Sequence, residues 1–401
     1  MKIFVTIKTP REDLSLQTLA TQIETEITHA GFTPFIASKE LEKRGLTPGF
    51  MQFIRQHIEQ SDLLLLLYHP DLRGGLIEQG IAYALGIPVW LGGSARGLLG
   101  RRHPIQFRHA RGKALKEADV VVVAGFPFDF RLKYGLGIGA RAKVVAANLS
   151  GEELRKNRRP QVAAQIHPAD FLRRLADAAG PGEGRWAEWL GSVRAREEAR
   201  DAEIAGQART SGELVDPVHF FLRLEEKMAD DAVIVADGGD FVATAAYTVR
   251  PRAPLSWLDP GVFGTLGVGG GFAVGAATVR GKGTEVWILF GDGSCAYSLA
   301  EIDTCVRHGL APIAVVGTDA SWGQIARDQV KILGDDVGTV LRKTAYHSVA
   351  EGYGGVGLLL DDPRRIDEVL DRAIEIARAG KPVVVNVHLA RSEFREGSIS
   401  I

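Results

Sequence analysis

The stretches that decide the fold are VWILFGDGS at residues 286–294 and PIAVVGTDASWG at residues 312–323. In each, a short apolar run leads into an aspartate, Asp292 in the first and Asp319 in the second. Residues 298–308, between them, have the pattern of a helix. We therefore expect a strand, a loop, a helix, a strand and a loop. This order places both carboxylates at the carboxyl ends of parallel strands, where ligands bind in open α/β sheets.

Two carboxylates at such an edge suit a hard divalent cation. Mg2+ typically takes one or two carboxylates together with phosphate oxygens. Gly291 and Gly293 flank Asp292 and allow the backbone to approach a phosphate closely. The residues thus predict a Mg2+-bridged diphosphate. Taken singly, Asp292 also fits a helix N-cap and Asp319 a turn.

Length and composition set broad limits on the class of protein. The chain has 401 residues, enough for two or three domains, and 48 Lys and Arg against 49 Asp and Glu. The near-zero net charge gives no reason to expect nucleic acid or a membrane as a partner. The start of the chain is strand-like rather than a signal peptide. Cys295 and Cys305 lie too far apart along one helical segment to bridge, so we expect reduced thiols and a cytoplasmic protein.

Strand and helix patterns alternate along the chain. They predict an α/β protein with two doubly wound parallel-sheet (Rossmann-like) domains in tandem. The first domain spans residues 1–180 and ends at a turn-rich break. The highly charged residues 181–211 predict a helical linker, and residues 212–401 form the second domain. There, Asp216 and Pro217 open a helix and residues 264–279 form a glycine-rich helix.

The Gly-Asp-Gly at 291–293, followed after about two dozen residues by Thr318-Asp319, resembles a known signature. It is similar to that of thiamine diphosphate (ThDP) enzymes of the acetolactate synthase-like and 2-hydroxyacyl-CoA lyase type. Thr318 stands where that family usually has an Asn. The resemblance covers residues 88–401, as half of the central domain (88–180) and the diphosphate-binding domain (212–401). Other matching segments are LGGSARGLLG at 91–100, ADVVVVAG at 118–125 and FREGSISI at 394–401.

The resemblance implies a ThDP and Mg2+ site built from four loops. Asp292, Asp319 and the backbone carbonyl of Ser321 would bind the metal. The implied cofactor contacts are Gly239, Asp240, Phe241, Gly264, Thr265, Leu266, Gly291, Asp292, Gly293, Ser294, Asp319, Ser321, Trp322 and Gly323. Leu266 takes the position of the apolar side chain that wedges between the two cofactor rings. The backbone of Asp240, rather than its carboxylate, is expected to meet the diphosphate.

Enzymes of this family also use a Glu on a separate pyrimidine-binding domain to help deprotonate the cofactor. We find no segment that resembles that domain, so the resemblance implies a partner chain that carries it. It also implies a homodimer, and carbon–carbon lyase or ligase chemistry on a small 2-keto acid or 2-hydroxyacyl substrate. Arg391 and Arg395 in the tail fit contacts to an anionic substrate, and ordinary surface charge accounts for them equally well.

Residues 1–87 are instead similar to nucleoside 2-deoxyribosyltransferases. The matching segments are KIFV at 2–5, SDLLLL at 61–66 and GGLIEQGIAYA at 74–84. In that family a Glu at the Glu78 position attacks the anomeric carbon of the sugar, with Asp71 as a supporting carboxylate. A helix start for Glu78 and a turn for Asp71 are the ordinary alternatives.

Three functions therefore stay open at the level of sequence. The first is a ThDP enzyme that needs a second domain in trans. The second is a nucleoside N-glycosidase or deoxyribosyltransferase that acts through Glu78. The third is a cofactor-binding protein without catalysis. The joined halves fit a natural fusion, an engineered chimera or a half-enzyme.

Overall fold

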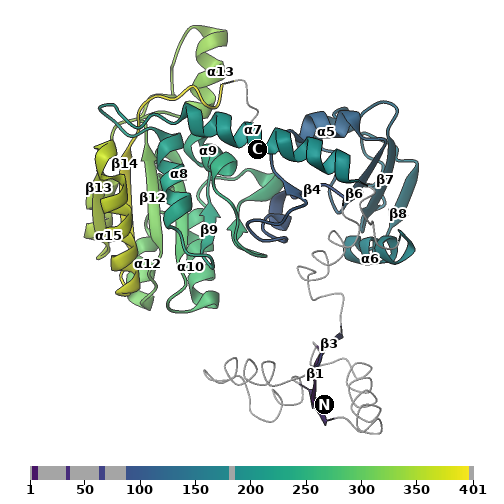
Figure 1. Ribbon diagram of the computed structural model, residues 1–401. Coiled ribbons are helices and arrows are strands. Elements are labelled where there is room, and N and C mark those ends of the chain that lie inside the picture. The colour runs from purple at the N-terminus through teal and green to yellow at the C-terminus, as the bar shows by residue number, and fades with distance from the viewer. Residues whose placement is uncertain (1, 8–32, 37–62, 68–86, 180–185, 397–401) are drawn as a thin grey trace. The chain divides into compact units, whose positions relative to one another are not determined.

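A computed structural model describes residues 2–7, 33–36, 63–67, 87–179 and 186–396 (Figure 1). The chain divides into two compact units, residues 1–74 and 75–401. Neighbouring strands within each described sheet run parallel, as alternating strands and helices predict. The predicted α/β class is therefore confirmed.

The first unit contains a three-stranded sheet in the order β2-β1-β3. Its strands are β1 (Lys2–Ile7), β2 (Thr33–Ile36) and β3 (Leu63–Leu67). The order places β1 in the centre, where Phe4 is paired with Phe35 on one side and Leu64 on the other. The apolar runs IFV at 3–5 and LLLLL at 63–67 lie within β1 and β3.

The second unit begins with two small parallel sheets. One pairs β4 (Val89–Trp90) with β5 (Gln106–Phe107), and the other has the order β6-β7-β8. The bounds of the latter strands and of the two helices nearby are β6 (Val120–Ala124), β7 (Lys143–Asn148), β8 (Val162–Gln165), α5 (Arg111–Glu117) and α6 (Pro168–Ala179). Phe128, Val144 and Leu154 are among the residues of the core of this region.

The largest sheet has six strands in the order β10-β9-β11-β12-β14-β13. Its strands are β9 (Val233–Ala236), β10 (Trp257–Leu258), β11 (Val286–Gly291), β12 (Ile313–Thr318), β13 (Val356–Leu360) and β14 (Val383–His388). In the pair β11 and β12, Gly291 is in register with Gly317. The segments that follow these two strands therefore begin at the same edge of the sheet.

Helices cover both faces of this sheet, as Figure 1 shows. Side chains alternate along β11, so that Trp287 and Leu289 enter the core shared with α8, α9 and α15, while Ile288 and Phe290 enter the core shared with α10 and α14. The helices are α7 (Ala187–Gln207), α8 (Pro217–Lys227), α9 (Asp240–Thr248), α10 (Gly269–Arg280), α11 (Asp292–Ser298), α12 (Glu301–His308), α13 (Gly323–Leu333), α14 (Tyr346–Gly352) and α15 (Ile366–Arg378).

Local signals explain where several helices begin. The carboxylate of Asp216 accepts a hydrogen bond of 2.9 Å from the His219 N–H, so α8 begins with the predicted cap. The glycine-rich helix predicted from residue 264 begins instead at Gly269, because Gly264 and Gly267 have positive φ angles that end or precede a helix. Cys295 and Cys305 are both free and buried, as expected.

Among the described residues, no helix combines the length and the apolar content that crossing a membrane requires.

The core beneath α9 generates a stability prediction. Phe221 is fully buried, and its ring centroid lies 4.3 Å from that of Phe241. We expect Phe221→Ala to lower the free energy of unfolding by about 3–5 kcal/mol because it leaves a cavity. The matched change Phe263→Ala, at a side chain that is 87% exposed, should cost less than about 0.5 kcal/mol. Urea unfolding followed by circular dichroism measures both, and equal losses would contradict the assigned core.

Candidate functional site

Three strand-to-helix junctions, called the loops of the site below, meet at the carboxyl edge of the six-stranded sheet. They are residues 237–240 between β9 and the start of α9, 291–294 from the end of β11 into α11, and 319–323 between β12 and the start of α13. The Gly291 N–H donates a hydrogen bond of 3.1 Å to the Gly238 carbonyl. A Cβ on Gly291 would lie only 3.0 Å from that carbonyl oxygen. The first two loops are thus in backbone contact, which a larger residue at 291 would disturb.

Asp292 and Asp319 occupy adjacent loops, as their positions after paired strands predict. Asp292 is 2% exposed, and its two carboxylate oxygens accept hydrogen bonds of 2.8 Å from the N–H groups of Gly293 and Ala320. Asp319 accepts a hydrogen bond of 3.1 Å from the Ser321 N–H. Ala320 has a left-handed φ of 60°, a costly conformation for alanine, and from there its N–H reaches Asp292.

The structure does not give Asp292 the alternative role of a helix N-cap, but it does give Asp319 the alternative role of a turn residue. Gly291, not Asp292, occupies the N-cap position of α11, and Asp292 is the first residue of the helix. Asp319 does form a turn-type bond to the N–H two residues on. This bond uses one carboxylate oxygen and leaves the turn compatible with a ligand at the other.

Burial and nearby negative charge raise the pKa of both carboxyl groups. Burial, followed by the negative charge of Asp319, raises the pKa of Asp292 to about 7. Burial also raises the pKa of Asp319 to about 6, against the lowering effect of the Ser321 N–H. Ionising both the buried Asp292 and the half-buried Asp319 is therefore unfavourable, and a nearby cation would favour the two carboxylates. Their chemistry therefore fits a divalent metal with oxygen ligands.

Glycines keep the edge open where side chains would block it. Gly239 has a φ of 104°, which favours glycine, and directly precedes α9. A Cβ on Gly293 would lie 2.5 Å from the ring of Trp322, so Gly293 also makes room for this tryptophan. Gly323 lies beside Asp319, whose Oδ2 would be 3.1 Å from a Cβ at that position. The arrangement forms a cradle of backbone groups that suits a phosphate.

The hydroxyl of Ser294 bonds within the protein instead of pointing to a phosphate. Its hydroxyl is buried and lies 3.1 Å from the carbonyl oxygens of both Gly238 and Gly291, to which it can donate. The hydroxyl thus ties two loops of the site together. The backbone N–H of Ser294, in the first turn of α11, is the group that remains suited to a phosphate oxygen.

The fourth predicted loop, residues 264–267, is held by Asp237. The carboxylate of Asp237 accepts hydrogen bonds of 2.9 Å from the Gly267 N–H and 2.6 Å from the Gly269 N–H. Leu266 in this loop is 36% exposed, and its Cδ2 would lie 2.3 Å from a Cβ on Gly238. Asp237 is not among the predicted site residues. Its position directly after β9, like those of Asp292 and Asp319 after their strands, could have identified it.

Gly264 and Thr265 are exposed at the start of this loop. Their predicted contact with a cofactor stays a prediction, as does the role of the Ser321 carbonyl.

The side chain of Phe241 does not face the edge. It is buried against Phe220 and Phe221, and a Cβ on Gly317 would lie 2.3 Å from its ring. The packing of this side chain rules out the predicted cofactor contact through the Phe241 ring, because the ring lies in the core; a contact through its backbone N–H, in the first turn of α9, stays a prediction.

Tyr346 and Thr318 also support the site, although the sequence motif does not predict these roles. The Tyr346 hydroxyl donates a hydrogen bond of 2.9 Å to the backbone carbonyl of Asp292. Thr318, which stands where the resembling family has Asn, is fully buried and donates a hydrogen bond of 2.6 Å to Asn386. The Thr318 side chain is thus part of the core and leaves the neighbouring Asp319 at the edge.

Glu78 and Asp71, on which the glycosidase interpretation depends, lie outside the described residues. That interpretation stays a prediction.

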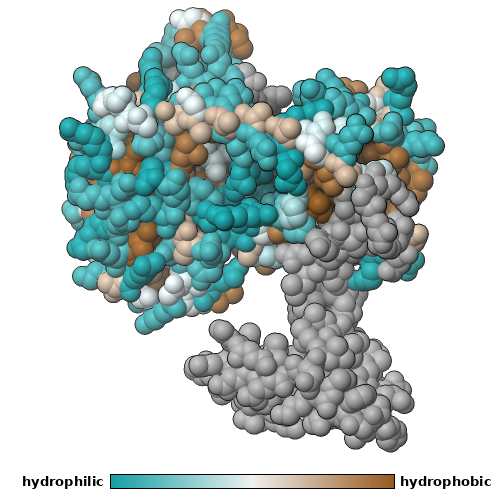
Figure 2. Space-filling model, viewed as in Figure 1, coloured by the Kyte–Doolittle hydropathy of each residue, from teal (hydrophilic) through white to brown (hydrophobic). Residues whose placement is uncertain are grey.

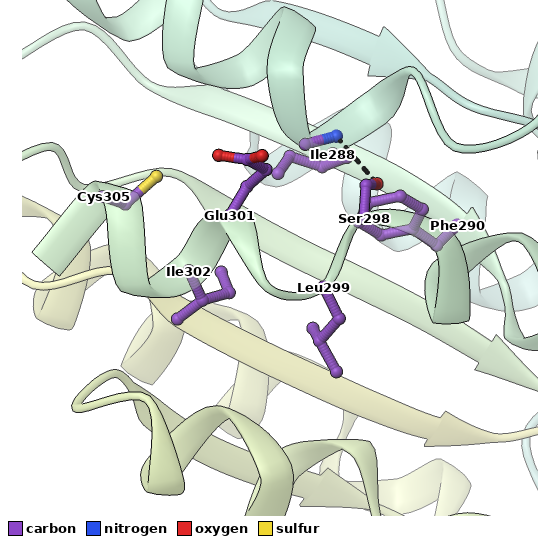
Figure 3. A pocket seen from close by; sticks show the side chains of 8 residues that line it. Ile288, Phe290, Ser298, Leu299, Glu301, Ile302 and Cys305 are labelled. Carbon is purple, nitrogen blue, oxygen red and sulfur yellow. Dashed lines mark hydrogen bonds between the residues drawn. The ribbon is translucent and has the colours of Figure 1, made fainter.

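A small pocket lies between α10, β11 and α12 (Figure 3). It is lined mainly by apolar side chains such as Ile288, Leu299 and Ile302, with Glu301 at one side. Neither Asp292 nor Asp319 lines it. We regard it as a gap in the core and not as the ligand site.

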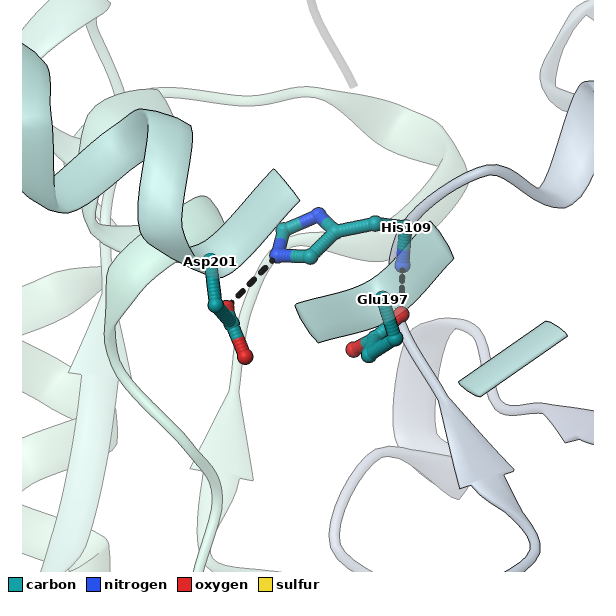
Figure 4. A group of neighbouring side chains, drawn as sticks. All are labelled: His109, Glu197 and Asp201. Carbon is teal, nitrogen blue, oxygen red and sulfur yellow. Dashed lines mark hydrogen bonds and ion pairs between the residues drawn. The ribbon is translucent and has the colours of Figure 1, made fainter. Parts of the chain in front are cut away.

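Glu197 and Asp201 of α7 form a second polar cluster with His109 (Figure 4). Glu197 accepts hydrogen bonds from the backbone N–H groups of Arg108 and His109. Asp201 accepts hydrogen bonds of 2.8 Å from Arg108 and 2.6 Å from Arg250. Two guanidinium groups already lie against Asp201 and would repel a cation, so we assign no metal there. The cluster fastens α7 to the segments around residues 108 and 250.

The raised pKa values of Asp292 and Asp319 predict that the metal-free protein loses stability as the pH rises. In an unfolded chain the pKa of Asp is about 4. Each carboxyl therefore holds its proton more tightly in the folded protein, and both destabilise it as pH rises from about 4 to about 7. Without metal at pH 8, we expect Asp319→Asn, which can keep the bond to Ser321, to stabilise the protein by about 1–3 kcal/mol.

Urea unfolding in EDTA at pH 4 and pH 8 measures this effect. The variant should match the unchanged protein at pH 4, and the exposed Asp328→Asn should match it at both pH values. A variant that gains nothing at pH 8 would show that the pair is not electrostatically strained.

Two stretches of the chain match known domain families. Residues 237–387 match the thiamine pyrophosphate enzyme C-terminal TPP binding domain, and residues 79–175 match the thiamine pyrophosphate enzyme central domain. The resemblance of residues 1–87 to deoxyribosyltransferases finds no support in these comparisons.

The chain is also similar to whole proteins. It is 46% identical to "2-hydroxyacyl-CoA lyase 2" of Caenorhabditis elegans over 329 residues, which are 79% of this chain and 51% of that protein. It is 45% identical to the Homo sapiens protein of the same name over 325 residues, which are 79% of this chain and 51% of that protein. It is 36% identical to "Probable acetolactate synthase" of Mycobacterium bovis over 308 residues, which are 75% of this chain and 54% of that protein. The chain thus spans about half the length of the curated relatives it matches.

A solved structure shares the fold. The thiamine diphosphate-dependent 4-hydroxybenzoylformate decarboxylase of Rhodococcus jostii RHA1 matches with a TM-score of 0.63 and 19% identity. The match covers 97% of this chain and 76% of that one. This likeness concerns the fold alone. The two matched domains and the similar whole proteins show that the chain belongs to the thiamine pyrophosphate enzyme family, of which it carries the central domain and the C-terminal TPP-binding domain.

Proposed function

We propose that this protein binds Mg2+ and ThDP at the carboxyl edge of the six-stranded sheet. We further propose that it takes part in carbon–carbon lyase or ligase chemistry on 2-keto acids or 2-hydroxyacyl compounds. The observation that carries the proposal is the pair Asp292, which is buried, and Asp319, which is half-buried: both carboxyls have raised pKa values, so a nearby cation would favour their charged forms. The glycine-lined loops beside the pair supply backbone N–H groups for a diphosphate.

Each group in the cradle has a defined task in this proposal. Carboxylate oxygens of Asp292 and Asp319, with the backbone carbonyl of Ser321, hold Mg2+. The N–H groups at the starts of α9 and α11 bind diphosphate oxygens, and Leu266 supports the organic part of the cofactor. When bound, ThDP supplies the nucleophilic carbon that makes and breaks carbon–carbon bonds. The protein contributes binding, orientation and charge.

The relatives support the proposed substrate class. Proteins named 2-hydroxyacyl-CoA lyase 2 and acetolactate synthase are similar to this chain over more than three hundred residues. We propose that a pyrimidine-binding domain, needed to deprotonate the cofactor, is supplied by another chain. In support, Phe263 and Tyr297 are exposed apolar side chains at the loop that carries Leu266, where a partner could cover them.

We also propose a homodimer through the outer face of α10. Gly271 and Gly275 have open space where a Cβ would be, and Phe272 and Val279 are exposed on this helix. A second apolar surface lies on α13, whose exposed side chains include Ile325, Ile332 and Leu333 (Figure 2). We assign the dimer to α10 because its small residues allow a close approach of a second helix.

The proposed cofactor site predicts a metal-dependent affinity. We expect ThDP to bind the full chain in calorimetric titration with Mg2+ and at least about tenfold more weakly in EDTA. Asp319→Asn should remove this Mg2+ dependence, because it removes a charged ligand and can keep the local hydrogen bond to Ser321.

The exposed Asp328→Asn, on the neighbouring helix α13, is the control and should bind as the unchanged protein does. Binding that ignores Mg2+, or an Asp319→Asn variant that keeps its Mg2+ dependence, would refute the metal site. Failure of the unchanged protein to bind ThDP would refute the cofactor site as a whole.

The proposed dimer predicts a change of mass in solution. Sedimentation velocity should give twice the mass of the chain for the unchanged protein. The double variant Phe272→Asp/Val279→Asp should give the monomer, because it places charges on the α10 face. Ile332→Asp on α13 is the matched control. A control that dissociates while the double variant stays dimeric would move the interface to α13.

A further inference from the structure

A carboxylate that the proposed metal site does not use lies directly beside it. Asp240 is the first residue of α9, and its Cβ would lie 3.7 Å from a Cβ on Gly323, in the turn that carries Asp319. Its negative charge raises the pKa of Asp319, although less than burial does. An unpaired carboxylate here would repel a diphosphate at the start of α9 and weaken the attraction that a helix N-terminus exerts on anions.

Two arginines from distant parts of the sequence lie at this carboxylate. Arg327, from α13, forms an ion pair with Asp240 Oδ1. The Nε of Arg395, from the C-terminal segment, lies 3.9 Å from the same oxygen. Two positive charges therefore lie near one carboxylate, and this end of α9 carries no excess of negative charge.

The structure holds Arg395 firmly at this position. Its side chain is 3% exposed, and its guanidinium carbon lies 5.0 Å from the centroid of the Tyr247 ring on α9. Phe394 meets the same ring edge-on at 5.6 Å. The tail is also fixed at both sides, where Arg209 donates to the Arg391 carbonyl at 2.7 Å and Lys331 pairs with Glu396 at 2.7 Å.

We infer that Arg327 and Arg395 are positioning residues for the cofactor. They neutralise Asp240, so that the start of α9 accepts the negative charge of the diphosphate. The inference rests on the proposed ThDP site and adds two residues that have no place among its predicted contacts. It also gives the C-terminal segment a role at the diphosphate end of the site.

A charge-removal cycle separates this role from mere packing. Calorimetry on the full chain, with saturating Mg2+, measures the dissociation constant of ThDP for Arg327→Gln, Arg395→Gln and Asp240→Asn, and for the two double variants that combine Asp240→Asn with each arginine change. Inorganic pyrophosphate serves as a second probe that contains only the diphosphate. Thermal unfolding without ligand reports the state of the fold in every variant.

We expect each arginine change to weaken ThDP and pyrophosphate binding about tenfold or more. Asp240→Asn alone should bind at least as tightly as the unchanged protein. Each double variant should return to within about threefold of Asp240→Asn, because no charge is left to neutralise. The control Arg223→Gln removes an arginine that pairs with Asp367 between α8 and α15, and it should leave both affinities unchanged.

Double variants that bind as weakly as the single arginine variants would overturn the inference, because packing rather than charge would then explain the loss. Single variants that bind like the unchanged protein would also overturn it. Failure of the unchanged protein to bind ThDP would overturn the proposed cofactor site itself, which is a distinguishable result.

Discussion

The parallel pairing of β11 with β12 is the constraint on which the site depends. It sets Gly291 opposite Gly317, so that Asp292 and Asp319 follow their strands at the same edge of the sheet. The low polarity that makes these strands stable also raises the pKa of both carboxyls. The sheet therefore creates an electrostatic strain at its edge, and a bound cation would relieve it. Much of the surrounding architecture keeps this strained pair in place.

The supports of the pair come from well-separated parts of the chain. Ala320, in a left-handed conformation, donates to Asp292 from the next loop, and Tyr346 donates to the Asp292 carbonyl from α14. Asp237 holds the loop that carries Leu266, and the Ser294 hydroxyl lies between two loop carbonyls. Each hydrogen bond removes freedom from a loop that would otherwise lose entropy when a ligand binds. Such preorganisation is what a phosphate and metal site requires.

Part of the site was predictable from the sequence because its signals are local. Apolar runs located the strands, and the glycines around Asp292 indicated a backbone that must approach a ligand. The roles of Phe241 and Ser294 were not predictable in the same way. Both side chains turn inward, one to pack on Phe221 and the other toward the Gly238 and Gly291 carbonyls. A sequence motif records the identity of a residue, whereas the direction of its side chain depends on the neighbours that the fold brings.

The sequence alone determined the α/β class, the strands β11 and β12 and the two aspartates at their ends. It could do so because hydrophobic periodicity and glycine placement act over a few residues. Only the tertiary structure decided that Asp237 ties a loop 30 residues away, and that Asp240 meets Arg327 and Arg395. Those contacts join residues up to 155 positions apart (240 to 395), and local pattern carries no information about such pairings. They exist because packing of α9, α13 and the C-terminal segment brings their charges to one edge of the sheet.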